Sequence, residues 1–161
     1  DLCIAALLVG EAGRAIGVDA TPAMVAKARA SAMLAGLGHI EVHEGDMARL
    51  PLADASADVL ISNGSINLAL DKAAVLGEAF RILRPGGRFQ FADMVREDAG
   101  PGGCAAPQGG SWADCVSGTL AAGEVLAALR QAGFTEATLI ALTPYRTSPS
   151  TTGAVFRAVR P

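Results

Sequence analysis

Asp19, Asp46 and Asn63 are the residues whose types and positions first suggest chemistry, because each one ends or follows an apolar run typical of a buried strand. In a parallel sheet the carboxyl ends of the strands meet at one edge, where nucleotide-binding α/β folds bind their ligands. Asp19 also stands beside a predicted helix start, with Thr21 suited to the N-cap and Pro22 to the first helical position. A carboxylate in that place binds ribose hydroxyls. The sequence therefore predicts a ribose-binding corner at Asp19.

The elements that must position these residues alternate between strands and helices. Strands are predicted over Arg14–Asp19, His39–His43, Ala57–Ser62, Arg88–Met94, Thr138–Leu142 and Ala154–Val159. Helices are predicted over Asp1–Leu8, Pro22–Gly36, from an Asp71 cap to Leu83, and from a Thr119 cap through Leu120–Ala132. Arg84–Gly87 is predicted to be a helix stop and turn, and Val95–Gly118 a Gly-rich loop. This order predicts an α/β fold in one domain over residues 1–161, with a doubly wound, mostly parallel sheet and an antiparallel C-terminal hairpin.

Composition excludes several classes of protein. Aromatic residues make up 4% of the chain, so the core is predicted to consist of Ala, Val, Leu and Ile. Lys and Arg are scattered and the net charge is −3, which argues against a nucleic-acid partner. No apolar run approaches the roughly 20 residues of a membrane span. The odd set Cys3, Cys104 and Cys115 favours a reducing, cytoplasmic location. His39 and His43 have no third ligand at a suitable spacing, so no metal site is predicted.

The residues before Asp19 lack the strand and Gly-rich turn that such a sheet requires. Asp1–Leu8 is Ala- and Leu-rich and is predicted to be a helix. A ribose-binding acid follows its Gly-rich fingerprint by about 20 residues, which places the fingerprint immediately before Asp1. We therefore expect the sequence to begin just after that loop, without the first strand. An alternative takes Leu2–Val9 as the first strand and Gly10–Gly13 as the phosphate loop, although a strand follows there where a helix is required.

Four blocks of the sequence, in this order, are similar to motifs of the class I S-adenosylmethionine-dependent methyltransferases. The blocks are Val18–Met24, Glu44–Pro51, Asp58–Asn63 and Leu83–Arg88. The resemblance covers nearly the whole chain. It implies a Rossmann-like fold, S-adenosyl-L-methionine as the cofactor and a small molecule as the methyl acceptor.

Two further segments resemble the arsenite methyltransferases within that superfamily, namely Ile61–Leu68 with Asp71-Lys72, and Trp112–Gly118. The arsenite enzymes usually carry one cysteine where this chain has Gly64 and another where it has Cys115. Arsenic(III) is soft and is held by several thiolates. The resemblance therefore implies arsenite or another soft nucleophile as the acceptor, with Cys115 as the catalytic-site thiol.

The resemblance also assigns the cofactor contacts. It places Asp19 at the ribose hydroxyls, Asp46 at the adenine amino group and Met47 at the face of the ring. The complete set of predicted cofactor-binding residues is Asp19, Ala20, Thr21, Met24, Gly45, Asp46, Met47, Asn63 and Gly64.

Each of these assignments has a purely structural alternative. Asp19 could be a solvated acid at a strand end, and Asp46 could cap an Asx turn. Met24 could be a core residue, since Met24, Ala28 and Ala32 share one face of the predicted helix. Cys115 could be a buried cysteine at a loop hinge.

Two other functions compete with methyl transfer. A nicotinamide-dependent oxidoreductase would need a Tyr and a Lys on one helix, but Tyr145, Lys27 and Lys72 form no such pair. The second alternative is a non-catalytic methyltransferase fragment. Without the first strand, buried N–H and C=O groups of neighbouring strands lose their partners. We therefore expect the 161-residue chain alone to bind the cofactor weakly or not at all. Micromolar binding in a calorimetric titration would refute this expectation.

Overall fold

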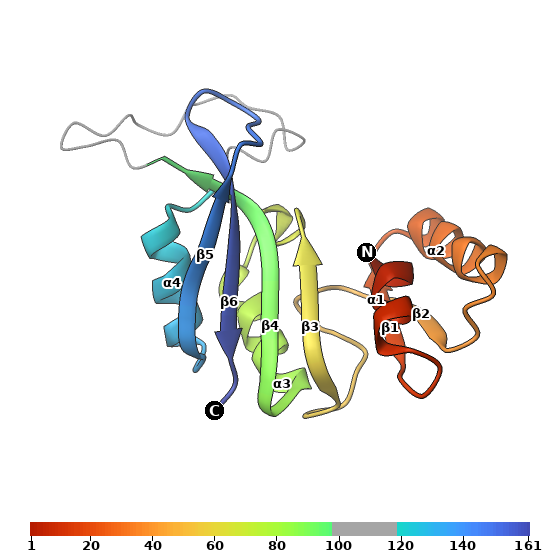
Figure 1. Ribbon diagram of the computed structural model, residues 1–161. Coiled ribbons are helices and arrows are strands. Elements are labelled where there is room, and N and C mark those ends of the chain that lie inside the picture. Colours follow the sequence, from red (N-terminus) through yellow and green to blue (C-terminus); the bar gives the residue numbers. More distant parts are fainter. Residues whose placement is uncertain (98–118) are drawn as a thin grey trace. The chain divides into compact units, whose positions relative to one another are not determined.

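The computed structural model describes residues 1–97 and 119–161 (Figure 1). These residues form two compact units, Asp1–Pro51 and Leu52–Pro161, and each unit is described by itself. Most of the predicted loop Val95–Gly118, with Cys104 and Cys115, lies outside the described residues. In the part of the chain that is described, no helix has the length and apolar character needed to cross a membrane.

The first unit is a strand–helix–strand motif preceded by a helix. Its elements are α1 (Leu2–Val9), β1 (Ala15–Asp19), α2 (Pro22–Leu34) and β2 (Ile40–Glu44). The strands β1 and β2 pair in parallel, in a register that runs from Ala15 opposite Ile40 to Asp19 opposite Glu44. The helix α1 confirms the predicted first helix, so the alternative with a strand over Leu2–Val9 is wrong.

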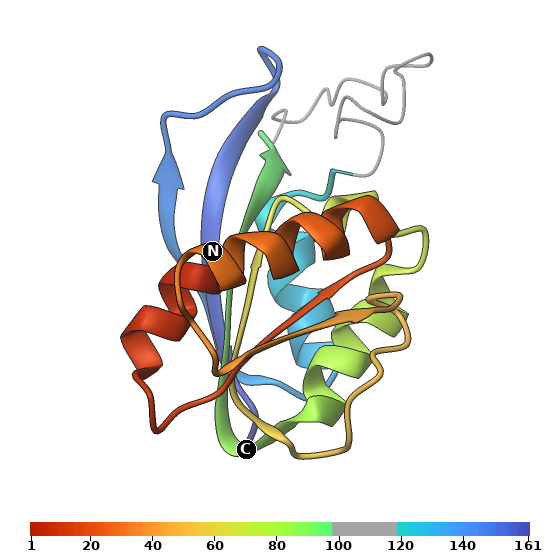
Figure 2. The ribbon, with the colours of Figure 1, turned by 90° about the vertical axis from the view of Figure 1, so that its right-hand side faces the viewer.

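The second unit is a four-stranded sheet with helices on one face (Figures 1 and 2). Its elements are β3 (Ala57–Asn63), the short 3-10 helix η1 (Ile66–Leu68), α3 (Lys72–Ile82), β4 (Leu83–Arg96), α4 (Ala122–Gln131), β5 (Thr135–Thr143) and β6 (Thr151–Val159). The strand order is β3-β4-β6-β5. The pair β3 and β4 is parallel, whereas β6 is antiparallel to both β4 and β5, which confirms the predicted C-terminal hairpin at one sheet edge.

The core of the second unit is largely aliphatic, as predicted, but it also contains a cluster of phenylalanine rings that the prediction left out. All five phenylalanines of the chain lie in this unit. Phe91 stacks on Phe89 and Phe156 with ring centroids 4.7 and 5.1 Å apart, and Phe134 lies 5.8 Å from Phe89 and 5.3 Å from Phe80. The low overall aromatic content concealed this concentration, because composition does not record where residues gather.

The strand β4 is longer at its start than predicted. The predicted helix stop is confirmed, because α3 ends at Ile82, but Arg84–Gly87 belongs to β4, with a shift in the register against β3, and is not a separate turn. The reason is a partner at the far end of the chain. The amide of Gly86 donates to the carbonyl of Arg160 at 2.8 Å, and the amide of Arg160 donates to the carbonyl of Gly87 at 2.9 Å. These bonds extend the sheet over residues that locally favour a turn.

The start of α4 also differs from the prediction. Ala121 is the N-cap, not Thr119, and the Glu124 carboxylate accepts a hydrogen bond from the amide of Ala121 at 2.7 Å.

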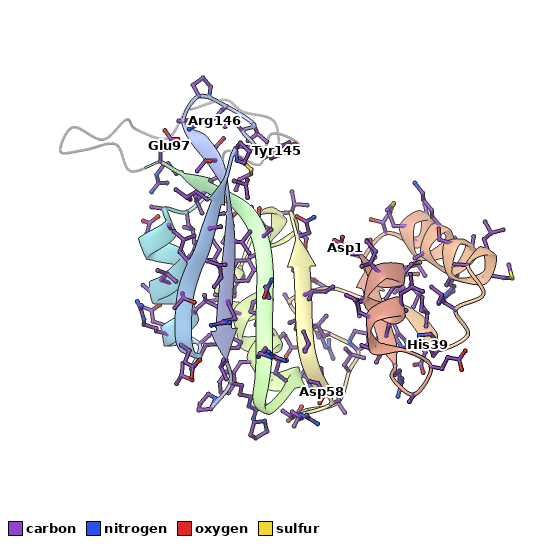
Figure 3. The ribbon with its side chains drawn as sticks, viewed as in Figure 1. Asp1, His39, Asp58, Glu97, Tyr145 and Arg146 are labelled. Carbon is purple, nitrogen blue, oxygen red and sulfur yellow. The ribbon has the colours of Figure 1, made fainter. Side chains whose placement is uncertain are left out.

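The connection between β5 and β6 is joined to the end of β4 by an ion pair, with Arg146 Nη1 2.6 Å from Glu97 Oε1 (Figure 3).

Arg160 closes the carboxyl end of α3, and its removal is expected to destabilise the second unit. Its Nη1 donates to the carbonyls of Phe80 and Arg81 at 3.1 and 3.0 Å and also to that of Leu83. Its guanidinium carbon lies 4.7 Å from the centroid of the Phe80 ring. We expect Arg160→Ala to lower the free energy of unfolding by about 2 kcal/mol in urea denaturation, because charged hydrogen bonds to helix-end carbonyls are lost. The exposed Arg157 supplies the matched control, and equal effects of the two alanine substitutions would contradict this role.

Candidate functional site

The first group of predicted site residues lies at the carboxyl ends of β1 and β2. The two strands are parallel and end in register, with Asp19 opposite Glu44. The amide of Gly45 donates to the carbonyl of Asp19 at 3.1 Å, so the two strand ends are directly bonded. Asp46 is the next residue in the chain after Gly45, and it is exposed. The structure therefore brings Asp19, Gly45 and Asp46 together at one edge.

Asp19 and Asp46 have the same hydrogen-bonding pattern. Asp19 Oδ1 accepts from the amide of Thr21 at 2.8 Å, and Asp46 Oδ1 accepts from the amide of Ala48 at 2.9 Å. The Asx turn considered for Asp46 is thus present. In each carboxylate the second oxygen, Oδ2, has no hydrogen-bond partner among the described residues. Each side chain is held in place through one oxygen and keeps an acceptor for a ligand hydroxyl or amino group.

The helix start after Asp19 is as predicted in position but not in its cap. Thr21 has an extended backbone and Pro22 takes the first helical position, but the Thr21 side chain makes no capping bond. The carbonyl of Thr21 instead accepts from the amides of Met24 and Val25. Ala20 is exposed beside these residues.

Met24 does not belong to the core. Its side chain is 48% exposed, whereas Val25 and Ala32 are the buried residues of α2. The prediction placed Met24 at the start of the buried face of α2, whereas the structure buries its neighbour Val25 there. Because Met24 lies one turn from Asp19 and faces outward, its thioether is accessible to a ligand near the strand end.

Gly45 is explained by packing between the strand end and the chain that follows it. A Cβ at this position would lie 2.8 Å from Cδ of Pro51 and 3.1 Å from Cγ1 of Val18. Only glycine fits without displacing these side chains. Met47, two residues on, is half-buried.

The second group of predicted site residues follows β3. Asn63 is the last residue of that strand and is exposed. Gly64 has φ +69°, and its amide donates to the carbonyl of Ala92 at 2.9 Å. Asn63 and Gly64 lie in the second unit, apart in the chain from Asp19 and Asp46 in the first. Cys115 lies outside the described residues.

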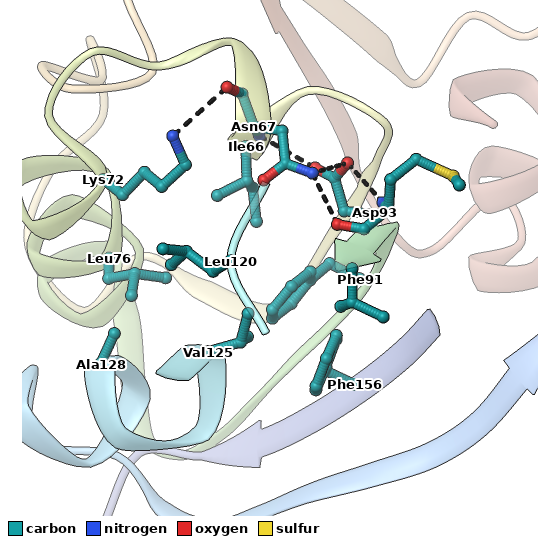
Figure 4. A pocket seen from close by; sticks show the side chains of 12 residues that line it. Ile66, Asn67, Lys72, Leu76, Phe91, Asp93, Leu120, Val125, Ala128 and Phe156 are labelled. Atoms are coloured by element: carbon teal, nitrogen blue, oxygen red, sulfur yellow. Dashed lines mark hydrogen bonds between the residues drawn. The ribbon is translucent and has the colours of Figure 1, made fainter. Parts of the chain in front are cut away.

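Two residues that the sequence-based prediction did not select are bonded to the segment after Gly64. Asp93 on β4 is 8% exposed and accepts hydrogen bonds from Asn67, as shown in Figure 4. Lys72 Nζ donates to the carbonyls of Asn67 and Ala69 at 3.3 and 3.0 Å. In the sequence, Asp93 could have been noticed as an acidic residue inside an otherwise apolar strand, between Phe91 and Met94.

A small cavity lies beneath this segment, against α3 and α4 (Figure 4). Its volume is about 20 Å³, enough for one water molecule. Its walls include Ile66, Leu76, Phe91, Val125 and Phe156. The cavity is too small for a substrate, so the candidate site remains at the strand ends.

Comparison with known proteins identifies the family. Residues 1–133 match the family described as a methyltransferase domain. An arsenite methyltransferase of Halobacterium salinarum is 39% identical over 134 residues, which cover 83% of this chain and 34% of that protein. An arsenite methyltransferase of Aquipseudomonas alcaligenes is 41% identical over 104 residues, which cover 60% of this chain and 30% of that protein. The chain thus spans about a third of the length of these curated relatives.

A solved structure shows the same fold. An arsenic(III) S-adenosylmethionine methyltransferase from Chlamydomonas reinhardtii superposes with a TM-score of 0.73 at 28% identity. The match covers 98% of this chain and 58% of that one. The predicted Rossmann-like α/β methyltransferase fold is confirmed.

Proposed function

Because this chain belongs to the S-adenosylmethionine-dependent methyltransferases, we propose that it contributes the cofactor site of an enzyme that methylates a small molecule with a soft nucleophilic atom. The observation that carries the proposal is the pair of strand-end carboxylates. Asp19 and Asp46 are each fixed through Oδ1 and each keep Oδ2 for a ligand. Two anchored acceptors at one sheet edge suit the hydroxyl and amino donors of an adenine nucleoside.

The individual roles that we propose are those that the family resemblance implies, and the strand-end positions are compatible with them. Asp19 accepts hydrogen bonds from the ribose hydroxyls and Asp46 accepts one from the adenine amino group. The thioether side chains of Met24 and Met47 contact the adenine ring, which sulfur contacts favourably. Ala20 and Thr21 border the ribose, while Gly45 allows the close packing that sets the edge.

Asn63 and Gly64, at the end of β3, are the further residues that we assign to the cofactor on the strength of the sequence motif. S-adenosylmethionine supplies an activated methyl group when bound. A soft acceptor that arrives with a free lone pair, such as arsenic(III), a thiolate or a selenolate, has no proton to lose before the methyl transfer, so no general base is required from the chain. Cys115 is the thiol that we assign to the acceptor. We also propose that residues 1–161 belong to one methyltransferase domain.

Arsenite is the acceptor that the relatives suggest, since the two arsenite methyltransferases described above are about 40% identical to this chain over the matched residues. Arsenic(III) prefers several thiolate ligands. Gly64 offers none, and Cys115 offers one. We therefore propose a soft acceptor that takes at most one thiolate from residues 1–161, either arsenite complexed with a small thiol or another sulfur or selenium nucleophile.

The experiment uses the longest polypeptide that the reading frame of this chain encodes, alongside the 161-residue chain. Each is incubated with methyl-labelled S-adenosylmethionine and arsenite with glutathione, a thiol, a selenol, an amine or a phenol. We expect label on one of the soft acceptors. Transfer to the amine or the phenol alone would contradict the soft-nucleophile proposal, and no transfer by the longer polypeptide would favour the non-catalytic alternative.

Gly64→Cys tests whether the backbone itself opposes a cysteine here. The φ of +69° at Gly64 is a conformation that residues with a Cβ rarely adopt, although no atom lies within 4 Å of the added carbon. We expect Gly64→Cys to lower the free energy of unfolding by about 1 kcal/mol in urea denaturation. Gly77→Cys is the control, because Gly77 is helical, exposed and equally unobstructed, and there a side chain should raise stability. An unchanged unfolding midpoint for Gly64→Cys would contradict the strain.

A further inference from the structure

Asp93 is the one charged side chain that is buried among the described residues, with 8% of its surface exposed. A carboxylate loses much favourable hydration when it is buried, so its position must be compensated by hydrogen bonds or by a cation. None of the ion pairs in the described part of the chain includes Asp93. The neighbouring Lys72 donates to backbone carbonyls and not to this carboxylate.

Neutral donors from two segments bind the Asp93 carboxylate (Figure 4). Oδ2 accepts from the backbone amide of Asn67 at 3.0 Å. Oδ1 accepts from the side-chain amide of Asn67 at 2.8 Å and from the backbone amide of Met94 at 2.8 Å. The same Asn67 side chain also donates to the carbonyl of Met94 at 2.7 Å. Asp93 and Asn67, which are 26 residues apart, therefore form a closed set of hydrogen bonds.

These bonds hold the segment after β3 against the end of β4. At one end of the segment the amide of Gly64 donates to the carbonyl of Ala92. At the other end Asn67 is bound to Asp93. Ser65 lies between them, and its hydroxyl is hydrogen-bonded at 2.7 Å to the hydroxyl of Ser62 on β3. Asn63 and Gly64 are thus fixed on both sides by neighbouring residues of one strand.

We propose that Asp93 is a positioning residue that acts through Asn67 to hold Asn63 and Gly64 in the geometry that binds the cofactor. This inference rests on the proposed function, which assigns Asn63 and Gly64 to the cofactor site. A buried carboxylate with neutral partners is a costly way to close a turn, and a hydrophobic pair could fill the same volume. What the carboxylate provides, and a hydrophobic pair does not, is a set of directional hydrogen bonds. The Asp93 carboxylate accepts from both the backbone and the side chain of Asn67.

The test compares Asp93→Asn with Asp58→Asn in the longest polypeptide of the reading frame. An amide at position 93 has the size of the carboxylate, but its amino group faces an N–H donor that the carboxylate accepted. We expect the dissociation constant for S-adenosylhomocysteine to rise about tenfold at a temperature where both proteins are folded. We also expect faster hydrogen exchange at the amides of Gly64 and Asn67. Asp58 lies exposed on β3, paired with Arg84, and its asparagine variant should bind like the parent.

Each outcome decides one of the two proposals. A lower unfolding temperature for Asp93→Asn with unchanged affinity and unchanged exchange at Gly64 would overturn the positioning role and leave a merely structural one. If the parent protein itself binds no S-adenosylhomocysteine, the proposed function fails. In that case hydrogen exchange at the amides of Gly64 and Asn67 still reports whether Asp93 orders the segment. Exchange that is the same in Asp93→Asn and in the parent protein would overturn the positioning role as well.

Discussion

Replacing Asp19 with asparagine is expected to weaken binding of S-adenosylhomocysteine by about 100-fold, because two hydrogen bonds from ribose hydroxyls to a charged acceptor are lost or reduced. The substitution is chosen to spare the local structure. Asn keeps a side-chain oxygen that can accept from the amide of Thr21, as Asp19 Oδ1 does at 2.8 Å. Only the charge and the second acceptor are removed. Isothermal titration calorimetry on the longest polypeptide of the reading frame measures the effect.

The matched control for Asp19→Asn is Glu44→Gln. Glu44 is opposite Asp19 in the register of β1 and β2 and is exposed, so it carries the same charge at the same sheet edge. The ribose role predicts that Glu44→Gln leaves the affinity within a factor of about two, since the ribose hydroxyls carry no net charge and an exposed carboxylate that does not contact them contributes little. Equal losses in the two variants would mean that the edge attracts the ligand by charge alone and that Asp19 has no specific contact.

Phe156→Ala is expected to lower the free energy of unfolding of the second unit by about 4 kcal/mol. Phe156 is fully buried on β6, and its ring stacks on Phe91 at 5.1 Å. The cavity under η1 already borders this ring, so removing the ring enlarges an existing void that the surrounding side chains fill only in part. Urea denaturation followed by circular dichroism measures the loss.

An exposed aromatic residue provides the control for this core substitution. Tyr145 is 67% exposed, and Tyr145→Ala should change the free energy of unfolding by less than about 0.5 kcal/mol. A loss for Phe156→Ala as small as that of the control would show that the second unit is not built around its phenylalanine rings.

Local sequence signals predicted most of the elements correctly. Asp71 was expected to cap a helix, and its Oδ1 does accept from the amide of Ala74 at 2.9 Å at the start of α3. The strand that ends at Asp19 begins within one residue of its predicted start. Both results depend on caps and apolar periodicity, which neighbouring residues in the chain determine.

Long-range contacts account for the differences. Arg84–Gly87 contains Pro and Gly and locally favours a turn, but the backbone of Arg160, more than 70 residues away, pairs with it and extends β4. The role of Asp93 was hidden for the same reason, since its partner Asn67 lies on another element. No pattern along one segment encodes a bond between two segments.

The candidate site was predictable in position but not in detail. Strand ends could be located from apolar runs, and this placed Asp19 and Asp46 at one edge. Each carboxylate uses one oxygen for its own turn and keeps the other, and this depends on a side-chain orientation that the three-dimensional structure determines. The assignment of these residues to the cofactor remains a prediction.

The most direct test is a crystal structure of the longest polypeptide of the reading frame with S-adenosylhomocysteine. We predict ribose hydroxyls within about 2.8 Å of the Asp19 carboxylate and the adenine amino group within about 3 Å of the Asp46 carboxylate. A nucleoside bound away from the carboxyl ends of β1 and β2, with both carboxylates in contact with solvent only, would contradict the proposed cofactor site.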